Sequence, residues 1–124
     1  MNASEYVAIK KPQATTMCSA ILYPDGEIKE CTGSHLETLM LPYGKKIWEE
    51  IPEDISPLFF MTAYTGAVLI DYENQIYSEG LTDKQEEALK LLYDENVLIK
   101  SPKELHVGNN ALGLRIKGKE EKDA

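Results

Sequence analysis

Arginine is scarce in this 124-residue chain, in which Arg115 is the sole example. Arginine is the side chain best suited to phosphates and base edges. The chain also carries 21 acidic against 13 basic residues, a formal net charge of -8. Because a nucleic-acid backbone repels such a protein, we expect no direct DNA or RNA binding. A basic partner surface fits this charge, although acidic composition often serves solubility alone.

Long apolar runs are missing as well. No stretch approaches the roughly 18 apolar residues of a membrane span, and the start MNASEYVAIKKP has no basic segment followed by an apolar run. Two cysteines in a chain of this size fit a reducing compartment, where thiols pack as small apolar groups. We therefore expect a cytoplasmic protein that does not contact membranes.

Familiar catalytic and cofactor motifs are also lacking. The chain has no GxxxxGK[ST] or GxGxxG phosphate loop, no GxSxG nucleophile turn and no calcium loop. Carboxylates that could hold a hard cation occur in turn-like surroundings, at Asp71, Glu73, Asp94 and Glu95. We predict no cofactor, and an enzyme ranks last among the function classes considered.

The stretch CTGSHLETLM places Cys31 four residues before His35. Ser34 and Glu37 have the S-x-x-E spacing of a capping box, which predicts a strand end followed by a helix. Four potential zinc ligands exist in the chain, but without a C-x-x-C or H-x-x-x-H pair; they are Cys18, Cys31, His35 and His106. We therefore predict no metal site. The interpretation of Cys31 as a nucleophile with His35 as its base has less support than the metal site, because the sequence indicates no third group to orient the histidine.

The first predicted hairpin turns at Pro24-Asp25-Gly26, and its loop length decides how Cys18 and Cys31 lie. In a two-residue loop, the numbers of residues paired across the hairpin sum to 51. Cys18 and Cys31 are then diagonal neighbours whose Cα atoms lie roughly 7–8 Å apart, too far for a disulfide. In a three-residue loop the sum is 50, and the thiols point to opposite faces. Both registers argue against a disulfide.

Periodicity and turn chemistry predict a single α+β domain over residues 1–116 and a disordered, charged C-terminal tail over residues 117–124. Three hairpins are expected, in TMCSAILYPDGEIKECTG, AVLIDYENQIYS and ELHVGNNALGLRIK. Helices are expected from Ser34, around KKIWEEI and in LTDKQEEALKLLYDEN, with short strands at residues 5–9 and 97–99. The last helix is expected to begin with a capping box of Thr82 and Gln85 and to end at Asn96 in a left-handed conformation. Residues 57–66 fit a helix capped by Ser56 or a buried strand. The antiparallel sheet built from these hairpins is expected to carry two or three helices on one face.

The helix LTDKQEEALKLLYDEN followed by a hairpin has the order of a winged helix. Its exposed side would carry Asp83, Glu86, Glu87 and Asp94, which would meet phosphates if the helix entered a groove. A winged arrangement in this chain therefore favours a protein partner over DNA.

Tyrosine is the one abundant aromatic, with seven residues against two phenylalanines and one tryptophan. Four tyrosines occur in the middle of the sequence, at Tyr64, Tyr72, Tyr77 and Tyr93. Amphipathic rings suit interfaces and ligand stacking, although half-buried strand positions also favour tyrosine.

These features predict a small, acidic, non-catalytic binding protein that docks on a basic protein partner. One concrete form is an inhibitor of a nucleic-acid-handling or defence protein, of the kind carried by phages or mobile elements. The alternative is a small-molecule, nucleotide-like binding or sequestering oligomer with tyrosine-lined sites. The candidate site residues are Tyr64, Tyr72, Tyr77, Tyr93, Asp83, Glu86, Glu87 and Arg115. Lys45 or Lys46 could meet a charge on such a ligand, and a homo-oligomer is compatible with both hypotheses.

Overall fold

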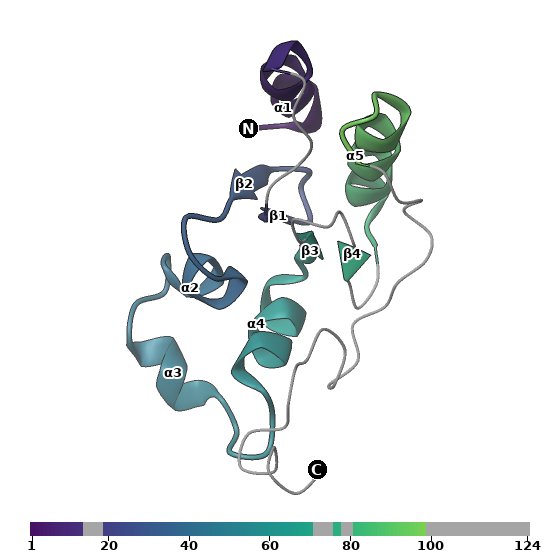
Figure 1. Ribbon diagram of the computed structural model, residues 1–124. Helices are drawn as coiled ribbons and strands as arrows, with labels where there is room; N and C mark the ends of the chain where they lie inside the picture. Colours follow the sequence, from purple (N-terminus) through teal and green to yellow (C-terminus); the bar gives the residue numbers. More distant parts are fainter. Residues whose placement is uncertain (14–18, 71–75, 78–80, 99–124) are drawn as a thin grey trace, which may run out of the picture.

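A computed structural model describes residues 1–13, 19–70, 76–77 and 81–98 (Figure 1). They form an α+β fold around an antiparallel sheet with strand order β2-β1-β3-β4, which confirms the predicted class. The elements are α1 (Ala3–Lys10), the 3-10 turn η1 (Lys11–Gln13), β1 (Ala20–Leu22), β2 (Ile28–Glu30), α2 (His35–Met40), α3 (Lys46–Glu50), α4 (Pro57–Thr65), β3 (Val68–Ile70), β4 (Ile76–Tyr77) and α5 (Asp83–Asp94).

The first hairpin joins β1 to β2 through the three-residue loop 24–26. The amide of Tyr23 donates to the carbonyl of Glu27 at 2.8 Å, and Gly26 takes a φ of +93°. This is the register in which paired residue numbers sum to 50, as in the pair of Ile21 and Lys29. Glycine suits the last loop position because only it adopts a left-handed backbone without steric cost.

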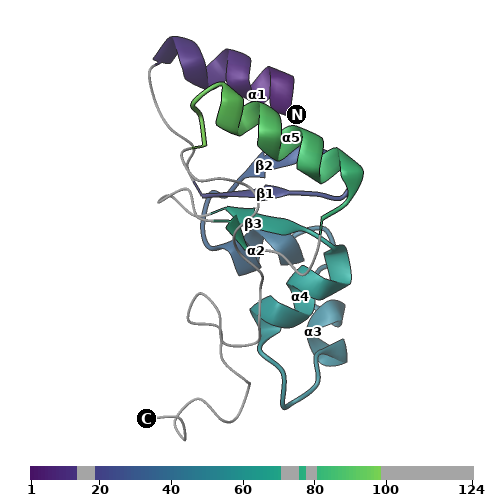
Figure 2. The ribbon, with the colours of Figure 1, turned by 90° about the vertical axis from the view of Figure 1, so that its right-hand side faces the viewer.

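Both faces of the sheet carry helices, whereas the sequence led us to expect them on one face. Helices α1 and α5 cover one face, and α2, α3 and α4 lie against the other (Figure 2). In β1 and β3 every residue is buried, with alternate side chains entering the two cores. The continuous apolar runs AIL and VLI are typical of strands buried on both sides, and this signal was overlooked.

Residues 5–9 are helical, so the predicted strand at this position is wrong. The side chain of Asn2 accepts from the Glu5 amide at 2.9 Å, and the Glu5 carboxylate accepts from the Asn2 amide at 2.8 Å. This capping box starts α1, and Asn is as good an N-cap as Ser or Asp. Tyr6, Val7 and Lys10 then share the buried side of α1.

The helices that the sequence predicts are present as α2, α3 and α5. Residues 57–65 form α4 rather than a strand, with Ser56 as N-cap, Pro57 at the first position and Gly66 left-handed at the end. Thr82 and Gln85 form the predicted capping box of α5, and Asn96 has the predicted positive φ, +63°.

The chain after α5 turns sharply instead of continuing directly as a strand. The amides of Val97 and Asn96 donate to the carbonyls of Leu92 and Tyr93, which is the hydrogen-bond pattern of a Schellman motif. Residues 97–98 are therefore buried residues of the C-terminal motif that ends α5, and they do not begin the expected strand.

The predicted hairpin of residues 67–77 is confirmed by the antiparallel pairing of β3 with β4. The third predicted hairpin, the winged arrangement that depends on it and the tail 117–124 lie outside the described residues. Among the helices that the structure does describe, none has the length and apolar character needed to cross a membrane.

Candidate functional site

Helix α5 presents an acidic surface to solvent. Its buried residues Gln85, Ala88, Leu89 and Leu92 face the sheet, so the opposite side of the helix points outward. Three predicted residues lie on that outer side and are exposed: Asp83, Glu86 and Glu87. We call them the α5 acidic face. Within the described parts of the chain, no ion pair neutralises any of the three.

The acidic residues at the end of α5 are in a different situation. Asp94 pairs with Lys90 at 3.0 Å, and Glu95 pairs with Lys11 at 2.6 Å. Uncompensated negative charge is therefore concentrated in the first half of the helix, where the amide dipole also favours carboxylates.

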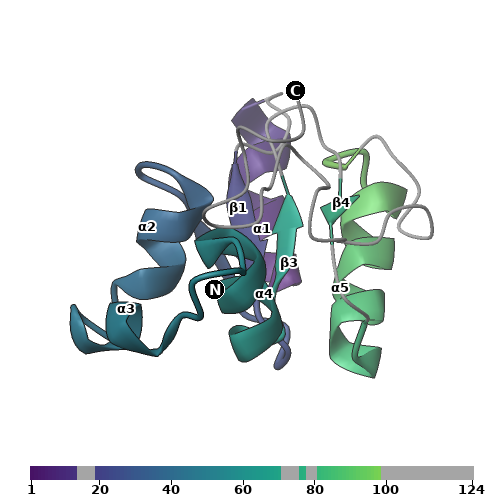
Figure 3. The same ribbon diagram turned by 90° about the horizontal axis from the view of Figure 1, so that it is seen from below.

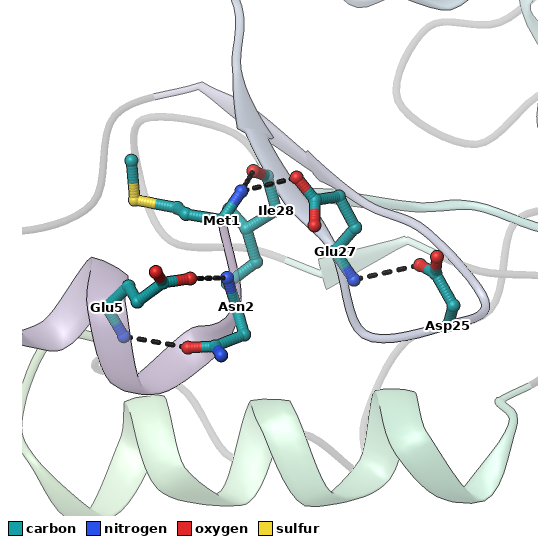
Figure 4. A network of polar contacts seen from close by, with 6 residues as sticks. All are labelled: Met1, Asn2, Glu5, Asp25, Glu27 and Ile28. Carbon is teal, nitrogen blue, oxygen red and sulfur yellow. Dashed lines mark hydrogen bonds and ion pairs between the residues drawn. The ribbon is translucent and has the colours of Figure 1, made fainter.

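A neighbouring group of carboxylates is engaged in local contacts (Figure 4). Glu27 forms an ion pair with the amino group of Met1, Asp25 accepts from the Glu27 amide at 3.0 Å, and Glu5 caps α1. Glu27 also lies at the edge strand β2, where the amide of Ile28 donates to the Met1 carbonyl at 2.6 Å. These contacts stabilise the fold, so the carboxylates of this group are less available to a partner than those of the α5 acidic face.

The start of α5 is fixed firmly to the sheet. Gln85 is fully buried, and its side-chain nitrogen donates to the carbonyls of Leu22 at 3.1 Å and Gly66 at 2.8 Å. Its side-chain oxygen accepts from the Thr82 amide, and the Thr82 hydroxyl donates to the carbonyl of Pro24 at 2.8 Å. The acidic face is thus built on a rigid element.

The predicted tyrosines do not form one cluster in the described residues. Tyr64 is on α4 and Tyr93 is on α5, so they lie on opposite sides of the sheet. Tyr77 is in β4, but its side chain is not described, and Tyr72 and Arg115 lie outside the described residues. The hypothesis of a tyrosine-lined ligand site therefore stays a prediction.

Tyr64 instead meets aromatic side chains that the sequence did not single out. Its ring packs edge-on against Tyr43 at 5.6 Å and stacks with Phe60 at 5.7 Å between centroids. Tyr23 is close to Tyr43: the pKa of the Tyr23 hydroxyl is raised by burial first, and then by the neighbouring Tyr43 and Cys31. The i, i+4 spacing of Phe60 and Tyr64 was a usable signal, whereas the approach of Tyr43 depends on the tertiary fold.

Cys31 and His35 are arranged as packing residues. Burial raises the pKa of the half-buried Cys31 thiol, and hydrogen bonds with Thr38 and Ser19 offset this only in part. The Nε2 atom of His35 lies 2.9 Å from the carbonyl of Ile70 and 3.2 Å from the Ser19 hydroxyl. Because a carbonyl can only accept, we assign a proton to Nε2, which leaves this nitrogen unable to act as a base. A nucleophile needs a lowered thiol pKa and a free base, so this geometry favours a structural role.

No family model, curated protein or solved structure matches the chain.

Metal ligands do not gather within the part of the chain that is described: it has no group of three or more His, Cys, Asp or Glu residues able to hold an ion. Cys18 and His106 lie outside this part, so the four-residue zinc set is not tested.

An open hollow of about 460 Å³ lies along the β2 edge, lined by Met1, Tyr6, Tyr23, Glu27, Ile28, Lys29 and Glu30. It contains none of the predicted site residues.

Proposed function

We propose that this chain is a non-catalytic binding protein that docks on a basic surface of a protein partner through the α5 acidic face. The observation that carries the proposal is that Asp83, Glu86 and Glu87 are exposed together on one rigid helix without a neutralising ion pair among the described residues. The net charge of -8 supports it, because the protein's field accelerates encounter with a basic surface.

A nucleic-acid-handling protein is the partner class that this charge fits best. Such a protein carries lysine and arginine at the surface that binds phosphate, and exposed carboxylates on a helix can occupy the same surface. Docking there would exclude the nucleic acid, so the chain would act as an inhibitor. This form of the proposal predicts competition between the chain and nucleic acid for one partner surface.

The first test compares binding of the wild type and a charge-neutralised variant to a synthetic peptide of alternating arginine and serine. The variant combines Asp83→Asn, Glu86→Gln and Glu87→Gln, and its net charge is -5, since three of the eight excess negative charges are removed. We expect affinity to fall by about tenfold, from the loss of exposed charge contacts of roughly 0.5 kcal/mol each. Titration calorimetry at low and high salt measures this, and the difference should shrink as salt is raised.

Lys84→Gln is the matched control, because Lys84 is exposed on the same helix and the change is of the same kind. It takes the net charge from -8 to -9, so the peptide should bind more tightly. Circular dichroism should show that all variants remain folded. If neutralising the α5 acidic face leaves affinity and its salt dependence unchanged, the proposal is wrong.

A further inference from the structure

The face of the molecule opposite α5 carries a second surface with the character of an interface. Tyr43 and Tyr64 are 43% and 52% exposed, although their rings contact each other, and Phe60 and Tyr23 extend the group as half-buried neighbours. We call these four residues the aromatic strip. It runs from the first hairpin across the α2–α3 connection to α4.

The fold does not require the aromatic strip to be exposed. The core beneath it is already formed by buried apolar residues from the sheet, α2, α3 and α4, namely Ile21, Leu39, Ile47, Met61, Ala67 and Leu69. Phe60 and Tyr23 pack against this core, whereas Tyr43 and Tyr64 are the exposed part of the strip. Contiguous exposed apolar groups of this kind mark interaction sites. Tyrosine is enriched at interfaces because its ring packs while its hydroxyl stays hydrogen-bonded.

The charge of the segment that supplies three of the four strip residues indicates what kind of molecule can cover the strip. Helices α2, α3 and α4 gather at one end of the molecule (Figure 3). Residues 34–66, which contain them, carry five exposed acidic side chains against two lysines, a net charge of -3; they are Glu37, Glu49, Glu50, Glu53 and Asp54 against Lys45 and Lys46. A second copy of the chain, a nucleic acid or an anionic membrane would bring more negative charge to this end.

We propose that the aromatic strip binds a protein segment that carries both apolar and arginine side chains. The apolar side chains would pack on Tyr43 and Tyr64, and arginine would stack on the ring faces, favoured by the net negative charge of residues 34–66. The inference rests on the proposed function for the basic character of the partner. It concerns a different surface, on the opposite face of the sheet from α5.

The test uses two synthetic peptides of equal length and equal charge, one of arginine and leucine and one of arginine and serine. Wild-type protein should bind the arginine–leucine peptide at least about tenfold more tightly, because buried aromatic anchors dominate interface energies. The double variant Tyr43→Gln with Tyr64→Gln should lose this preference, so that the two peptides bind equally. Calorimetric titration gives both affinities, and thermal unfolding checks that the variant is folded.

Ile9→Gln is the matched control, since Ile9 is also a large apolar residue on a helix and is 43% exposed, but it belongs to α1 on the other face of the sheet. It should leave the preference for the arginine–leucine peptide unchanged. Should the double variant fail to fold, Tyr64→Lys serves instead, because a cation at the strip would repel the arginines and remove the preference.

The outcomes separate this inference from the proposed function. If wild type shows no preference between the peptides, or if the preference survives in the folded strip variants, the inference is overturned, while binding that depends on the α5 acidic face still supports the function. If neither peptide binds, both proposals fail. If sedimentation shows a wild-type dimer that becomes a monomer on Tyr64→Lys, a second copy covers the strip and the inference is likewise overturned.

Discussion

At the scale of single residues, Gln85 shows how a polar side chain can be essential inside a small core. Its amide group makes three hydrogen bonds, with the carbonyls of Leu22 and Gly66 and with the amide of Thr82, so it joins α5, β1 and the end of α4. The capping box with Thr82 was visible in the sequence. The two long-range bonds were not, because they depend on how α5 docks against the sheet.

Gln85→Met should lower the free energy of unfolding by about 3 kcal/mol. The methionine keeps the helix propensity and nearly the volume, but leaves buried backbone groups without a partner, at about 1 to 3 kcal/mol for each unsatisfied group. Urea denaturation measures the loss. Glu86→Met, at the exposed neighbouring position, should change stability by less than about 0.5 kcal/mol. Equal effects of the two changes would show that the buried bonds contribute nothing.

At the scale of elements, the helix starts at Ser34 and Thr82 were predicted, and they begin α2 and α5. Ser56 caps α4, but the apolar run that follows it left a helix and a strand open. Helix α1 was missed because its cap is Asn2. Glu37 does not complete the predicted box at α2: its carboxylate accepts from the Ser34 hydroxyl at 3.3 Å. Helix ends depend on residues that can adopt a left-handed backbone, here Gly66 and Asn96.

Gly66 and Gly44 provide a matched pair for testing these left-handed positions. Both have a φ of +71°, but a Cβ at Gly66 would lie 3.0 Å from the Cγ of Pro24, whereas nothing lies within 4 Å of a Cβ at Gly44. Gly44→Ala should therefore cost about 1 kcal/mol from backbone strain alone. Gly66→Ala should cost about 1 kcal/mol more, because the turn at Pro24 must shift. Urea denaturation of both variants checks the difference, and equal losses would exclude a role for the Pro24 contact.

At the scale of the whole molecule, the α1–α5 layer is attached to the sheet by contacts between distant parts of the chain. Helices α1 and α5 lie side by side (Figures 1 and 2) and bury Tyr6 and Val7 against the sheet. The ammonium group of Lys10, a nearly buried residue, pairs with Glu30 at 2.9 Å, and the Tyr6 hydroxyl donates to the same carboxylate at 3.2 Å.

Removing charge at Glu30 should weaken the attachment of this layer. Glu30→Gln leaves the buried Lys10 ammonium facing a neutral amide, and we expect a loss of about 1 to 2 kcal/mol, since Glu30 itself is partly exposed. Glu95→Gln breaks the more exposed pair with Lys11 and should cost less than about 1 kcal/mol. Thermal unfolding at two salt concentrations measures both, and only the Glu95 effect should vanish at high salt. A larger loss for Glu95→Gln than for Glu30→Gln would contradict this account.

The sequence by itself determined the α+β class, the first two hairpins and most helix boundaries, because caps, turns and periodicity depend on residues close together in the chain. The exposed acids of α5 were predicted for the same reason. Only the tertiary structure decided that helices cover both faces, that Gln85 reaches Leu22 and Gly66, and that Tyr64 meets Tyr43 instead of Tyr93. These outcomes depend on which faces pack together, and packing between distant segments leaves no pattern in neighbouring residues.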